Sequence, residues 1–475
     1  MTPNRRNFLR TSALASTAVW FAPNAKAAPA SETLRVAVIG LRGRGKSHVS
    51  EILGAKGAKL VAVCDVDPEV LAKTVSDLDR KSVKVTTYSD FRKLCESPEI
   101  DAVTIATPNH THTLISVTAA ANGKHVYVEK PVSHCVWEGR QLALAAEKFG
   151  VIIQHGFQRR SETAWKDAFE WVRGGELGKL KIARGFCYKP RPSIGKAKGA
   201  QLAPEGLDYD LWSGPRMLQP IRRKQFHYDW HWQFPWGNGD LGNQGPHQLD
   251  VCRWALDDPK DLPRSIRSFG NRFGHDDDGQ WANTQIVALD YEAAPILFEV
   301  RGLPKKNLDY KSGMDEFRGQ RIGNVIEYEG GALLGGHGAR CTAVDSDGKE
   351  VRKFSGSKSH FVAWIESIRS GKQDPGLSAE SGHLSSALAH LGNISWLLGI
   401  PGGDDSDIDD PAVQDALDRM KGHLAANGID LSKTPMRVGP KLETVPGEEK
   451  LTEPWNARAA GLLKDTYRSG FELPI

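Results

Sequence analysis

Short apolar runs alternate with amphipathic stretches along the first third of the chain, beginning after residue 33. The apolar runs are rich in β-branched residues and predict buried strands at residues 34–39, 59–64, 84–88, 102–106, 125–128 and 151–153. The stretches between them predict helices at residues 46–53, 71–79, 91–95, 112–122 and 141–149. Strands that alternate regularly with helices are typical of an α/β domain with a parallel sheet, here at residues 33–155.

The pattern changes after residue 156, where strands follow one another with fewer helices between them. Strands are predicted at residues 179–188, 265–270, 284–291, 296–301 and 323–328, and helices at 246–254, 357–370, 384–398 and 412–426. The 357–370 helix has its apolar side chains at helical spacing, at Phe361, Trp364, Ile365 and Ile368. This pattern predicts a second, α+β domain at residues 156–400.

Residues 401–475 form an extension that differs in character from the domain before it. An acidic run at 404–410 precedes the helix predicted at 412–426. The last part contains large apolar residues that need burial, namely Trp455, Phe471 and Leu473. We therefore expect the extension to pack back on the body of the protein.

Residues 1–27 have the three parts of an export signal. The pair Arg5 and Arg6 precedes an uncharged stretch at 11–25, and Ala25-Lys26-Ala27 forms a cleavage site of the small-x-small type. The arginine pair indicates the twin-arginine route, which exports folded proteins. We therefore expect a periplasmic or secreted protein that contacts the twin-arginine translocase during export. The alternative is a disordered basic tail.

Composition limits the class of protein. The chain has 475 residues, of which 40% are hydrophobic and 25% charged, which suits two or three globular domains and excludes a disordered chain. Among 62 Lys and Arg and 58 Asp and Glu, four basic residues and no acidic one lie in residues 1–27. The remainder is formally neutral, so we expect no nucleic-acid partner. The 11–25 stretch is too short for a membrane anchor, and polar residues interrupt 384–400.

Neither the cysteines nor the acidic residues form a metal-binding pattern. The six cysteines include no C-x-x-C pair, and we expect them to be small buried side chains rather than ligands. The acidic run at 404–410 lacks the glycine and the terminal glutamate spacing of a calcium loop. We therefore expect no metal.

A glycine-rich turn joins the first predicted strand to the first predicted helix. Gly40, Gly43 and Gly45 allow the backbone to approach a pyrophosphate, and the N-terminus of the helix that follows supplies amide donors. Asp65 ends the second strand, 20 residues after Gly45, where a carboxylate binds a ribose diol and repels a 2′-phosphate. The turn therefore predicts a dinucleotide site that takes NAD rather than NADP.

Two arginines in this turn leave alternatives open. Arg42 stands where such turns usually have their second glycine, so an ordinary tight turn is one alternative. A guanidinium of Arg42 or Arg44 would compensate the charge of a 2′-phosphate, so NADP is the other.

Polar residues follow three of the predicted strands at their carboxyl ends, where ligands bind in open parallel sheets. They are Thr107, Pro108, Asn109 and His112 after the 102–106 strand, Glu129 and Lys130 after 125–128, and Gln158, Arg159 and Arg160 after 151–153. We expect these ends to lie beside the cofactor.

A later segment, residues 239–250, reads Gly-Asp-Leu-Gly-Asn-Gln-Gly-Pro-His-Gln-Leu-Asp. With the glycine turn, Thr107-Pro108-Asn109 and Glu129-Lys130-Pro131, it resembles in order and spacing the glucose–fructose oxidoreductase, inositol dehydrogenase and rhizopine-catabolism (Gfo/Idh/MocA) family. The resemblance covers residues 33–400. It implies a Rossmann NAD-binding domain followed by a domain with a large, mostly antiparallel sheet that helices cover on one face.

The resemblance also implies roles for individual residues. In the family, the lysine that Lys130 matches contacts the reacting hydroxyl and the cofactor, and His247 matches a catalytic histidine of inositol dehydrogenase. The cofactor contacts expected from the turn, the strand ends and the family motifs are Gly40, Arg42, Gly43, Arg44, Gly45, Asp65, Thr107, Pro108, Asn109, His112, Glu129, Lys130 and Gln158.

Oxidation of a secondary alcohol requires a base for the hydroxyl proton, and Lys130 and His247 are the two candidates. Partial burial would lower the pKa of Lys130 toward a useful value. A structural salt bridge with Glu129 is the alternative for this lysine.

His247 falls in the first turn of a helix that Pro246 begins, with Asp250 on the same face to orient the ring or cap a neighbour. A satisfied histidine of the core is the alternative. Asn243 stands where the family usually has an aspartate, and an amide cannot act as a base. This difference places the proton relay on Lys130 and His247.

Residues 226–236 are rich in aromatic side chains, whose faces stack on the C–H faces of sugars. The segment immediately precedes the His247 motif, so it is expected to form a wall of a carbohydrate site. The alternative is that its tryptophans pack in the core. The substrate contacts we expect are Arg159, Trp230, Trp232, Asn243 and His247.

Together these features predict an NAD-dependent oxidoreductase that acts on a sugar or polyol hydroxyl. An exported protein meets no pool of NAD to exchange, so we expect a tightly retained cofactor. One alternative is a redox-neutral glycosidase that oxidises, eliminates, adds water and reduces on one retained NAD. The other is a non-catalytic protein that binds sugar or NAD. The resemblance implies a homo-oligomer, either a dimer or a tetramer.

Overall fold

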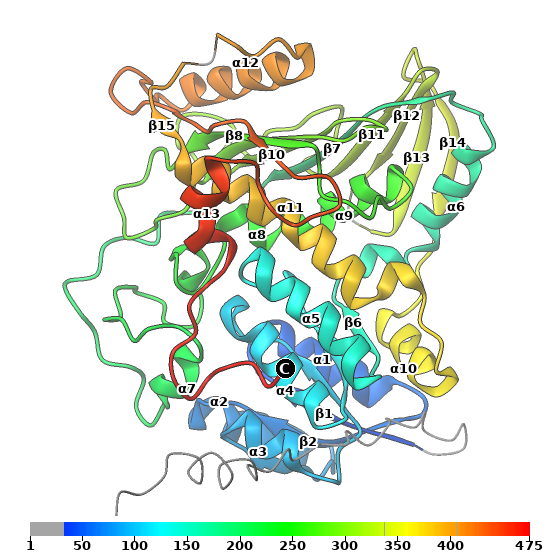
Figure 1. Ribbon diagram of the computed structural model, residues 1–475, viewed down its shortest axis with the longest axis vertical. Coiled ribbons are helices and arrows are strands. Elements are labelled where there is room, and N and C mark those ends of the chain that lie inside the picture. Colours follow the sequence, from blue (N-terminus) through cyan, green and yellow to red (C-terminus); the bar gives the residue numbers. More distant parts are fainter. Residues whose placement is uncertain (1–32, 337, 405) are drawn as a thin grey trace, which may run out of the picture.

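The computed structural model describes residues 33–336, 338–404 and 406–475, and the predicted export signal at 1–27 lies outside them. Two sheets organise the chain, one in each half of the view in Figure 1, with a long helix between them. The N-terminal sheet lies at the bottom of this view and the larger C-terminal sheet at the top.

The first sheet is parallel throughout and has the strand order β3-β2-β1-β4-β5-β6. Its strands are β1 (Leu34–Ile39), β2 (Ala58–Cys64), β3 (Thr86–Tyr88), β4 (Ala102–Ile105), β5 (His125–Val128) and β6 (Ile153–His155). The helices between them are α1 (Arg44–Gly54), α2 (Pro68–Asp79), α3 (Phe91–Glu96), α4 (His112–Ala121) and α5 (Val136–Phe149). This strand order is that of the Rossmann fold, as the alternating pattern predicts.

One helix from the second half of the chain completes the core of the first unit. Helix α10 (His360–Ser370) packs its apolar stripe, including Trp364, against Val36 and Val38 of β1. The sequence predicted this helix but assigned it to the second domain. It covers the first sheet because its apolar stripe is buried against the β-branched side chains of that sheet.

The second sheet is mostly antiparallel and has the order β14-β13-β12-β11-β7-β10-β9-β8-β16-β15, with β17 paired to β8. Its first strands are β7 (Leu180–Tyr188), β8 (Ser265–Asn271), β9 (Thr284–Asp290), β10 (Ile296–Arg301) and β11 (Ile322–Tyr328). The remaining strands are β12 (Gly331–Gly335), β13 (Arg340–Asp345), β14 (Glu350–Ser355), β15 (Ile400–Pro401), β16 (Arg437–Val438) and β17 (Leu442–Glu443). Strands β7 and β10 form the parallel pair in this order.

Helices cover the inner face of this sheet and join it to the first unit (Figure 1). They are α6 (Thr163–Arg173), α8 (Gly239–Asn243), α9 (Gly245–Ala255) and α11 (Ala379–Leu398). Helix α11 is buried over most of its length because it packs against α5 on one side and against β8 and α9 on the other. The two units therefore share one hydrophobic interior.

The C-terminal extension covers the opposite, outer face of the second sheet. Helix α12 (Pro411–Ala426) packs Leu417 and Met420 against apolar side chains of β7–β10 (Figure 1). Beneath it, the buried Glu299 carboxylate accepts hydrogen bonds from Arg301 at 2.8 Å and from Arg419 at 2.7 Å. Part of the outer face is thus occupied by the chain itself.

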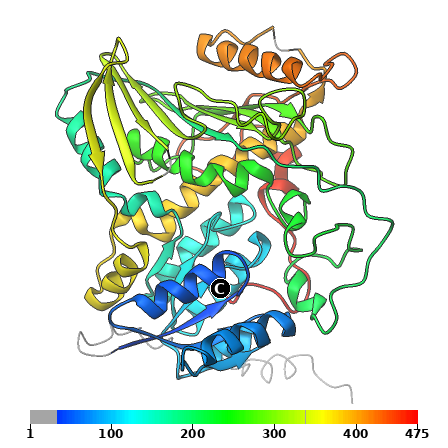
Figure 2. The ribbon, with the colours of Figure 1, turned by 180° about the vertical axis from the view of Figure 1, so that it is seen from behind.

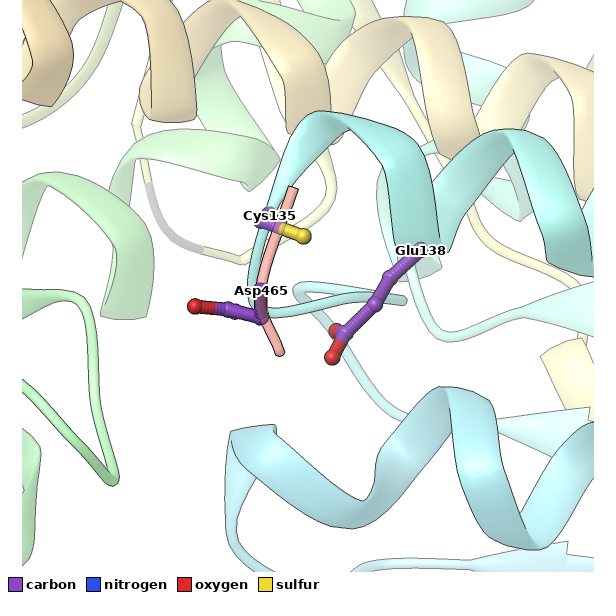
Figure 3. A group of neighbouring side chains, drawn as sticks. All are labelled: Cys135, Glu138 and Asp465. Atoms are coloured by element: carbon purple, nitrogen blue, oxygen red, sulfur yellow. The ribbon is translucent and has the colours of Figure 1, made fainter. Parts of the chain in front are cut away.

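The last residues pack on the body of the protein, as the sequence predicts, and they reach both units. Trp455, the first residue of helix α13 (Trp455–Leu463), packs on the hydrophobic core of the second sheet. After this helix, Phe471 and Leu473 join the core of the first sheet. Cys135, Glu138 and Asp465 come together where this tail crosses the start of α5, with ligand atoms within 4.8 Å of one another (Figure 3).

An arginine accounts for the cluster of Cys135, Glu138 and Asp465. The Arg216 guanidinium forms ion pairs with both carboxylates, at 3.0 Å to Glu138. Burial raises the pKa of the Cys135 thiol well above its usual range. In Figure 3 the three side chains do not point at a common centre. These contacts dock the tail through charge pairing.

The structure adds elements that the pattern analysis missed. Strand β12 contains two glycines, and β14 is an edge strand with mostly exposed, charged side chains, so neither has the apolar alternation of a half-buried strand. Helix α6 does have a helical apolar stripe, with Trp165, Phe169 and Val172 buried. Among the described residues, we find no helix with the length and apolar character needed to span a membrane.

Candidate active site

A cavity of about 500 Å³ lies at the carboxyl ends of the first sheet, between the two units. The predicted site residues that line it are Gly40, Arg42, Gly43, Arg44, Asp65, Thr107, Pro108, Asn109, His112, Glu129, Lys130, Gln158, Trp230, Asn243 and His247. Gly45, Arg159 and Trp232 are outside its lining. Residues from distant parts of the chain thus meet at the edge where open parallel sheets bind ligands.

The glycine turn leaves a cradle for a ligand on its cavity side. Gly40 has φ of 83°, and a Cβ there would lie 2.8 Å from the Ala106 carbonyl carbon, so only glycine fits between β1 and β4. Gly43 also has a positive φ, of 45°. No side chain caps the N-terminus of α1, so its amides face the cavity with their dipole. This cradle fits a pyrophosphate.

Gly45 has a different task from the one predicted. A Cβ at Gly45 would lie 1.8 Å from the Gly40 carbonyl oxygen. The residue is buried and allows the turn to fold onto the first turn of α1. Gly45 therefore shapes the cradle without lining it.

Asp65 follows β2 and lines the cavity. Its Oδ2 accepts a hydrogen bond from the Leu41 amide at 2.8 Å, and its Oδ1 accepts one from the Asp67 amide at 3.0 Å. Burial raises the pKa of Asp65 to about 6, against these amide bonds. The carboxylate thus braces the turn as well as facing the cavity.

Glu129 is the most connected side chain in the site. Its Oε1 accepts hydrogen bonds from Arg44 Nε at 2.8 Å, His48 Nε2 at 3.1 Å and Gln158 Nε2 at 3.2 Å. Burial alone would raise its pKa, but His48, Arg44 and Lys130 together hold the pKa far below its usual range. Glu129 is therefore an anion that fixes the surrounding side chains, and Arg44 is already paired.

Lys130 forms no side-chain salt bridge with its neighbour Glu129, because its ammonium points to α8. Its Nζ donates to the Asn243 carbonyl oxygen at 2.5 Å and to Asn243 Oδ1 at 3.1 Å. Burial lowers the pKa of Lys130 to about 8, although the Glu129 charge opposes this shift. The side chain can therefore lose and regain a proton near neutral pH.

His247 stands at the start of α9 and lines the same cavity. Burial lowers its pKa well below the usual range, and the charge of Lys130 adds to this effect, so the imidazole is neutral. Among the described residues, no hydrogen bond to its ring is formed. The ring is therefore free to exchange a hydrogen bond with a ligand.

Asp250 does not orient the His247 ring, which was one of the two roles that the sequence left open for it. Its carboxylate accepts hydrogen bonds from Arg160 at 2.7 and 2.8 Å and from Ser385 at 2.8 Å. Asp250 is fully buried, and Arg160 also binds Asp258. This ion pair joins the end of the first unit to α9, so Asp250 positions the helix rather than the histidine ring.

The predicted substrate residues Arg159 and Trp232 face other partners. Arg159 Nη1 donates to the Gly336 carbonyl oxygen at 2.8 Å. Trp232 turns its Nε1 to Asp240 and has the Arg191 guanidinium over its ring at 5.4 Å. Both side chains therefore contact other protein groups beside the cavity rather than lining it.

Other residues of the aromatic segment line the cavity and were not singled out in advance. They are His227, Tyr228 and His231, together with Leu211 and Trp212 from the region around α7 (Tyr209–Ser213). The many aromatic residues at 226–236 indicate that this segment lies at the site. They do not show which rings face the cavity, because successive residues of the single-turn helix at Asp229–Trp232 point in different directions. His48 was also missed, because only the fold brings it to Glu129.

Comparisons with known proteins agree with this architecture. A family model described as "Oxidoreductase family, NAD-binding Rossmann fold" matches residues 34–157. A second, described as "Oxidoreductase family, C-terminal alpha/beta domain", matches residues 177–315.

Curated relatives match the chain over part of its length. The scyllo-inositol 2-dehydrogenase (NAD(+)) of Bacillus subtilis is 36% identical over 155 residues, which is 32% of this chain and 44% of the relative. The myo-inositol 2-dehydrogenase of Thermotoga maritima is 30% identical over 159 residues, 34% of this chain and 46% of the relative. A glycosyl hydrolase family 109 protein of Shewanella pealeana is 29% identical over 169 residues, 30% of this chain and 37% of the relative. The chain thus spans less than half the length of these relatives.

Solved structures show the same fold over more of the chain. Levoglucosan dehydrogenase in complex with NADH has a TM-score of 0.56 at 16% identity, covering 75% of this chain and 95% of that one. The myo-inositol dehydrogenase of Lactobacillus casei, in complex with NAD(H) and myo-inositol, has a TM-score of 0.53 at 18% identity, covering 76% and 94%. The two family models together match more than half of the sequence in the expected order, and the chain belongs to the Gfo/Idh/MocA family of oxidoreductases, whose N-terminal domain is an NAD-binding Rossmann fold.

Proposed function

We propose that the protein is an NAD-dependent oxidoreductase that acts on a hydroxyl group of a sugar or polyol. The observation that carries this proposal is the Lys130 ammonium, held by Asn243 in the same cavity as the glycine turn and His247. The similarity to inositol dehydrogenases supports the substrate class.

The residues of the first unit fit NAD. The backbone at Gly40 and Gly43 and the uncapped start of α1 would hold the pyrophosphate, and Asp65 would accept hydrogen bonds from the ribose diol. When bound, NAD supplies the acceptor for the hydride of the alcohol. Glu129 already compensates the charge of Arg44 by pairing with its Nε, and Asp65 would repel a 2′-phosphate, so both residues favour NAD over NADP.

Lys130 and His247 perform the proton chemistry in this proposal. A neutral Lys130 Nζ takes the proton of the substrate hydroxyl, while the two oxygens of Asn243 keep the amine in place. The neutral His247 ring donates or accepts a hydrogen bond at the same hydroxyl or its neighbour.

The segment 190–236 supports a retained cofactor. It reaches from the second sheet to the corner of β2 and α2, beside which it runs in Figures 1 and 2. His227 Nε2 donates to Asp67 Oδ2 at 2.8 Å, and the Asp208 amide donates to the Val66 carbonyl oxygen at 3.3 Å. Because these contacts close the cavity near Asp65, release of the dinucleotide would require them to open.

The first test is to purify the protein, denature it, and identify and count the nucleotide released. About one NAD per chain is expected. NADP would contradict the role of Asp65 and direct attention to Arg42. Sugars and polyols are then added to the native protein, and reduction of the nucleotide is followed by its absorbance.

A lysine variant tests the chemistry separately from cofactor binding. Lys130→Ala is expected to lower turnover by at least about 100-fold, as loss of a general base does. Its nucleotide content is expected to stay at the wild-type value, because the cradle of Gly40 and α1 is intact. Turnover like that of the wild type would remove Lys130 from the mechanism.

A redox-neutral glycosidase on the same cofactor is the second candidate. The similarity to glycosyl hydrolase family 109 proteins favours it, as does the presence of two proton-transfer groups, Lys130 and His247, in one cavity. Product analysis separates the two functions. An oxidoreductase yields a keto-sugar or a lactone, whereas a glycosidase releases an aglycone with no net reduction of nucleotide.

We also propose export by the twin-arginine route and a periplasmic or secreted location. The support is the Arg5-Arg6 pair with the cleavage site at Ala25-Lys26-Ala27. Replacement of both arginines by lysine is expected to keep the protein in the cytoplasm, as measured by cell fractionation. Export of the doubly substituted chain would contradict the route.

The dimer or tetramer stays a prediction. Because α12 lies over β7–β10, copies that pair through the outer sheet face would contact α12 there rather than the strands. Light scattering of the purified protein measures the number of copies directly.

A further inference from the structure

Tyr228, Trp230 and His231 form an aromatic wall of the cavity that contains Lys130. The Trp230 and His231 rings stack with centroids 3.7 Å apart and planes at 17°. The Tyr228 and His231 rings have centroids 5.0 Å apart. Stacking on Trp230 fixes the plane of the His231 ring, and this restricts the directions in which the two ring nitrogens can point.

The hydrogen bonding of His231 determines which nitrogen faces a ligand. Its Nδ1 lies 2.6 Å from the Tyr228 carbonyl oxygen, and a carbonyl only accepts, so Nδ1 carries the hydrogen. Nε2 therefore has a free lone pair. Among the described residues, none donates to this atom. Burial lowers the pKa of His231 to about 3, with the charges of Lys130 and Arg191 adding to the effect, so the ring is neutral.

The Tyr228 hydroxyl has the complementary character. It accepts a hydrogen bond from Arg191 Nη1 at 2.8 Å, and because arginine only donates, the phenolic hydrogen is left for another acceptor. Arg191 is itself fixed by Asp240, with Nε 3.1 Å from Oδ1. Its charge is thus compensated, and Tyr228 presents a neutral donor.

We propose that His231 and Tyr228 form a hydroxyl-recognition subsite for a neutral polyhydroxylated ring, in which His231 Nε2 accepts from one substrate hydroxyl and Tyr228 donates to another. This inference rests on the proposed function and assigns its substrate class. A neutral acceptor beside a neutral donor matches the two hydrogen-bonding roles of hydroxyl groups. A carboxylate or phosphate would place its oxygens against the Nε2 lone pair, which is unfavourable.

The test uses three variants whose side chains change one feature each. His231→Phe keeps the stack on Trp230 but removes Nε2, and His231→Gln restores an acceptor. Tyr228→Phe removes the phenolic donor. Tyr310→Phe is the matched control, because Tyr310 also bonds to Arg191, through its carbonyl oxygen at 3.0 Å, but does not line the cavity.

The probes are D-glucose, its monodeoxy derivatives and D-glucuronate, added to the purified protein with its nucleotide. Binding is followed by tryptophan fluorescence and turnover by nucleotide reduction. His231→Phe is expected to raise KM for glucose about 10- to 100-fold with little change in kcat, and His231→Gln to recover part of the loss. The wild type is expected to bind one of the monodeoxy sugars more weakly than glucose. The His231→Phe variant is expected to bind that sugar and glucose with equal affinity. Tyr310→Phe is expected to match the wild type.

The outcomes separate this inference from the proposed function. If glucose is oxidised but His231→Phe and Tyr228→Phe bind and turn it over like the wild type, the subsite is wrong and the oxidoreductase stands. If glucose binds in a manner that depends on His231 without reducing the nucleotide, the subsite stands and the oxidoreductase is wrong. Tighter binding of glucuronate than of glucose, or no binding of any probe by the wild type, overturns the subsite.

Discussion

The rate of catalysis is expected to rise with pH through an apparent pKa of about 8, and Glu129→Gln is expected to move this rise to lower pH. In the proposed mechanism, the neutral form of Lys130 is the base. Burial lowers its pKa from 10.5 to about 8. At pH 7 this value leaves roughly a tenth of the side chains neutral, whereas 10.5 would leave about one in three thousand.

Glu129 has the opposite influence on the lysine, because its negative charge raises the pKa of Lys130. Removing that charge leaves burial and the nearby cations, including Arg44, which all lower it. The glutamine keeps an oxygen that can accept from Arg44 and His48. The ascending limb of kcat/KM therefore shifts to lower pH, and a larger fraction of the lysine is neutral at pH 7.

The assay is kcat/KM as a function of pH for the wild type and for Glu129→Gln, with nucleotide content measured in parallel. Glu327→Gln is the control, since it removes a carboxylate that pairs with Arg184 on the second sheet, at 2.7 Å. The control is expected to leave the limb in place. If the ascending limb of the kcat/KM profile is unchanged in Glu129→Gln, or moves to higher pH, Lys130 is not the titrating group.

Three further predictions concern the cofactor and the fold. Asp65→Ala removes the acceptor of the Leu41 amide, so the purified chain is expected to hold less NAD or to accept NADP; unchanged NAD content would contradict the ribose role. His227→Ala removes the contact to Asp67 and is expected to speed NAD release, as followed by fluorescence after dilution; an unchanged rate would show that this contact does not retain the cofactor. Glu299→Gln removes the buried carboxylate that Arg301 and Arg419 share, leaving them with Asp315 and Asp415 near the protein surface, and is expected to lower the free energy of unfolding by about 3 kcal/mol in urea titrations, whereas a change near zero would mean that the charge is not needed.

Sequence patterns predicted the first unit well because its signals are local. Strands β1, β2, β4 and β5 are mostly apolar on both faces. This pattern is typical of a parallel sheet that is covered by helices on both sides. Gly40 and Asp65 predict a dinucleotide site only because each directly follows such a buried strand. Once the order of strands is known, the carboxyl ends define the cavity.

The partners inside the site could not be predicted in the same way. Arg44 was considered as a possible phosphate ligand, yet it binds Glu129, which is 85 residues away. Asp250 shares a helix face with His247, yet it binds Arg160, 90 residues away. Spacing along one helix shows which side chains share a face. It does not show which neighbour from another element is nearer, because that depends on packing between elements.

Asn243 stands where the family resemblance leads us to expect an aspartate, and the two side chains would affect Lys130 differently. A carboxylate at this position would stand next to the Lys130 ammonium and stabilise its charged form, so the pKa of the lysine would be higher. The side-chain amide accepts one hydrogen bond from Nζ through Oδ1 without adding charge, and the main-chain carbonyl oxygen of the same residue accepts the other. Glu129 already raises the pKa of Lys130 through its charge, and a carboxylate at 243 would add to that effect. Asn243 therefore holds the ammonium by hydrogen bonds without a charge that would raise its pKa further, as the proposed role of Lys130 as a base near neutral pH requires.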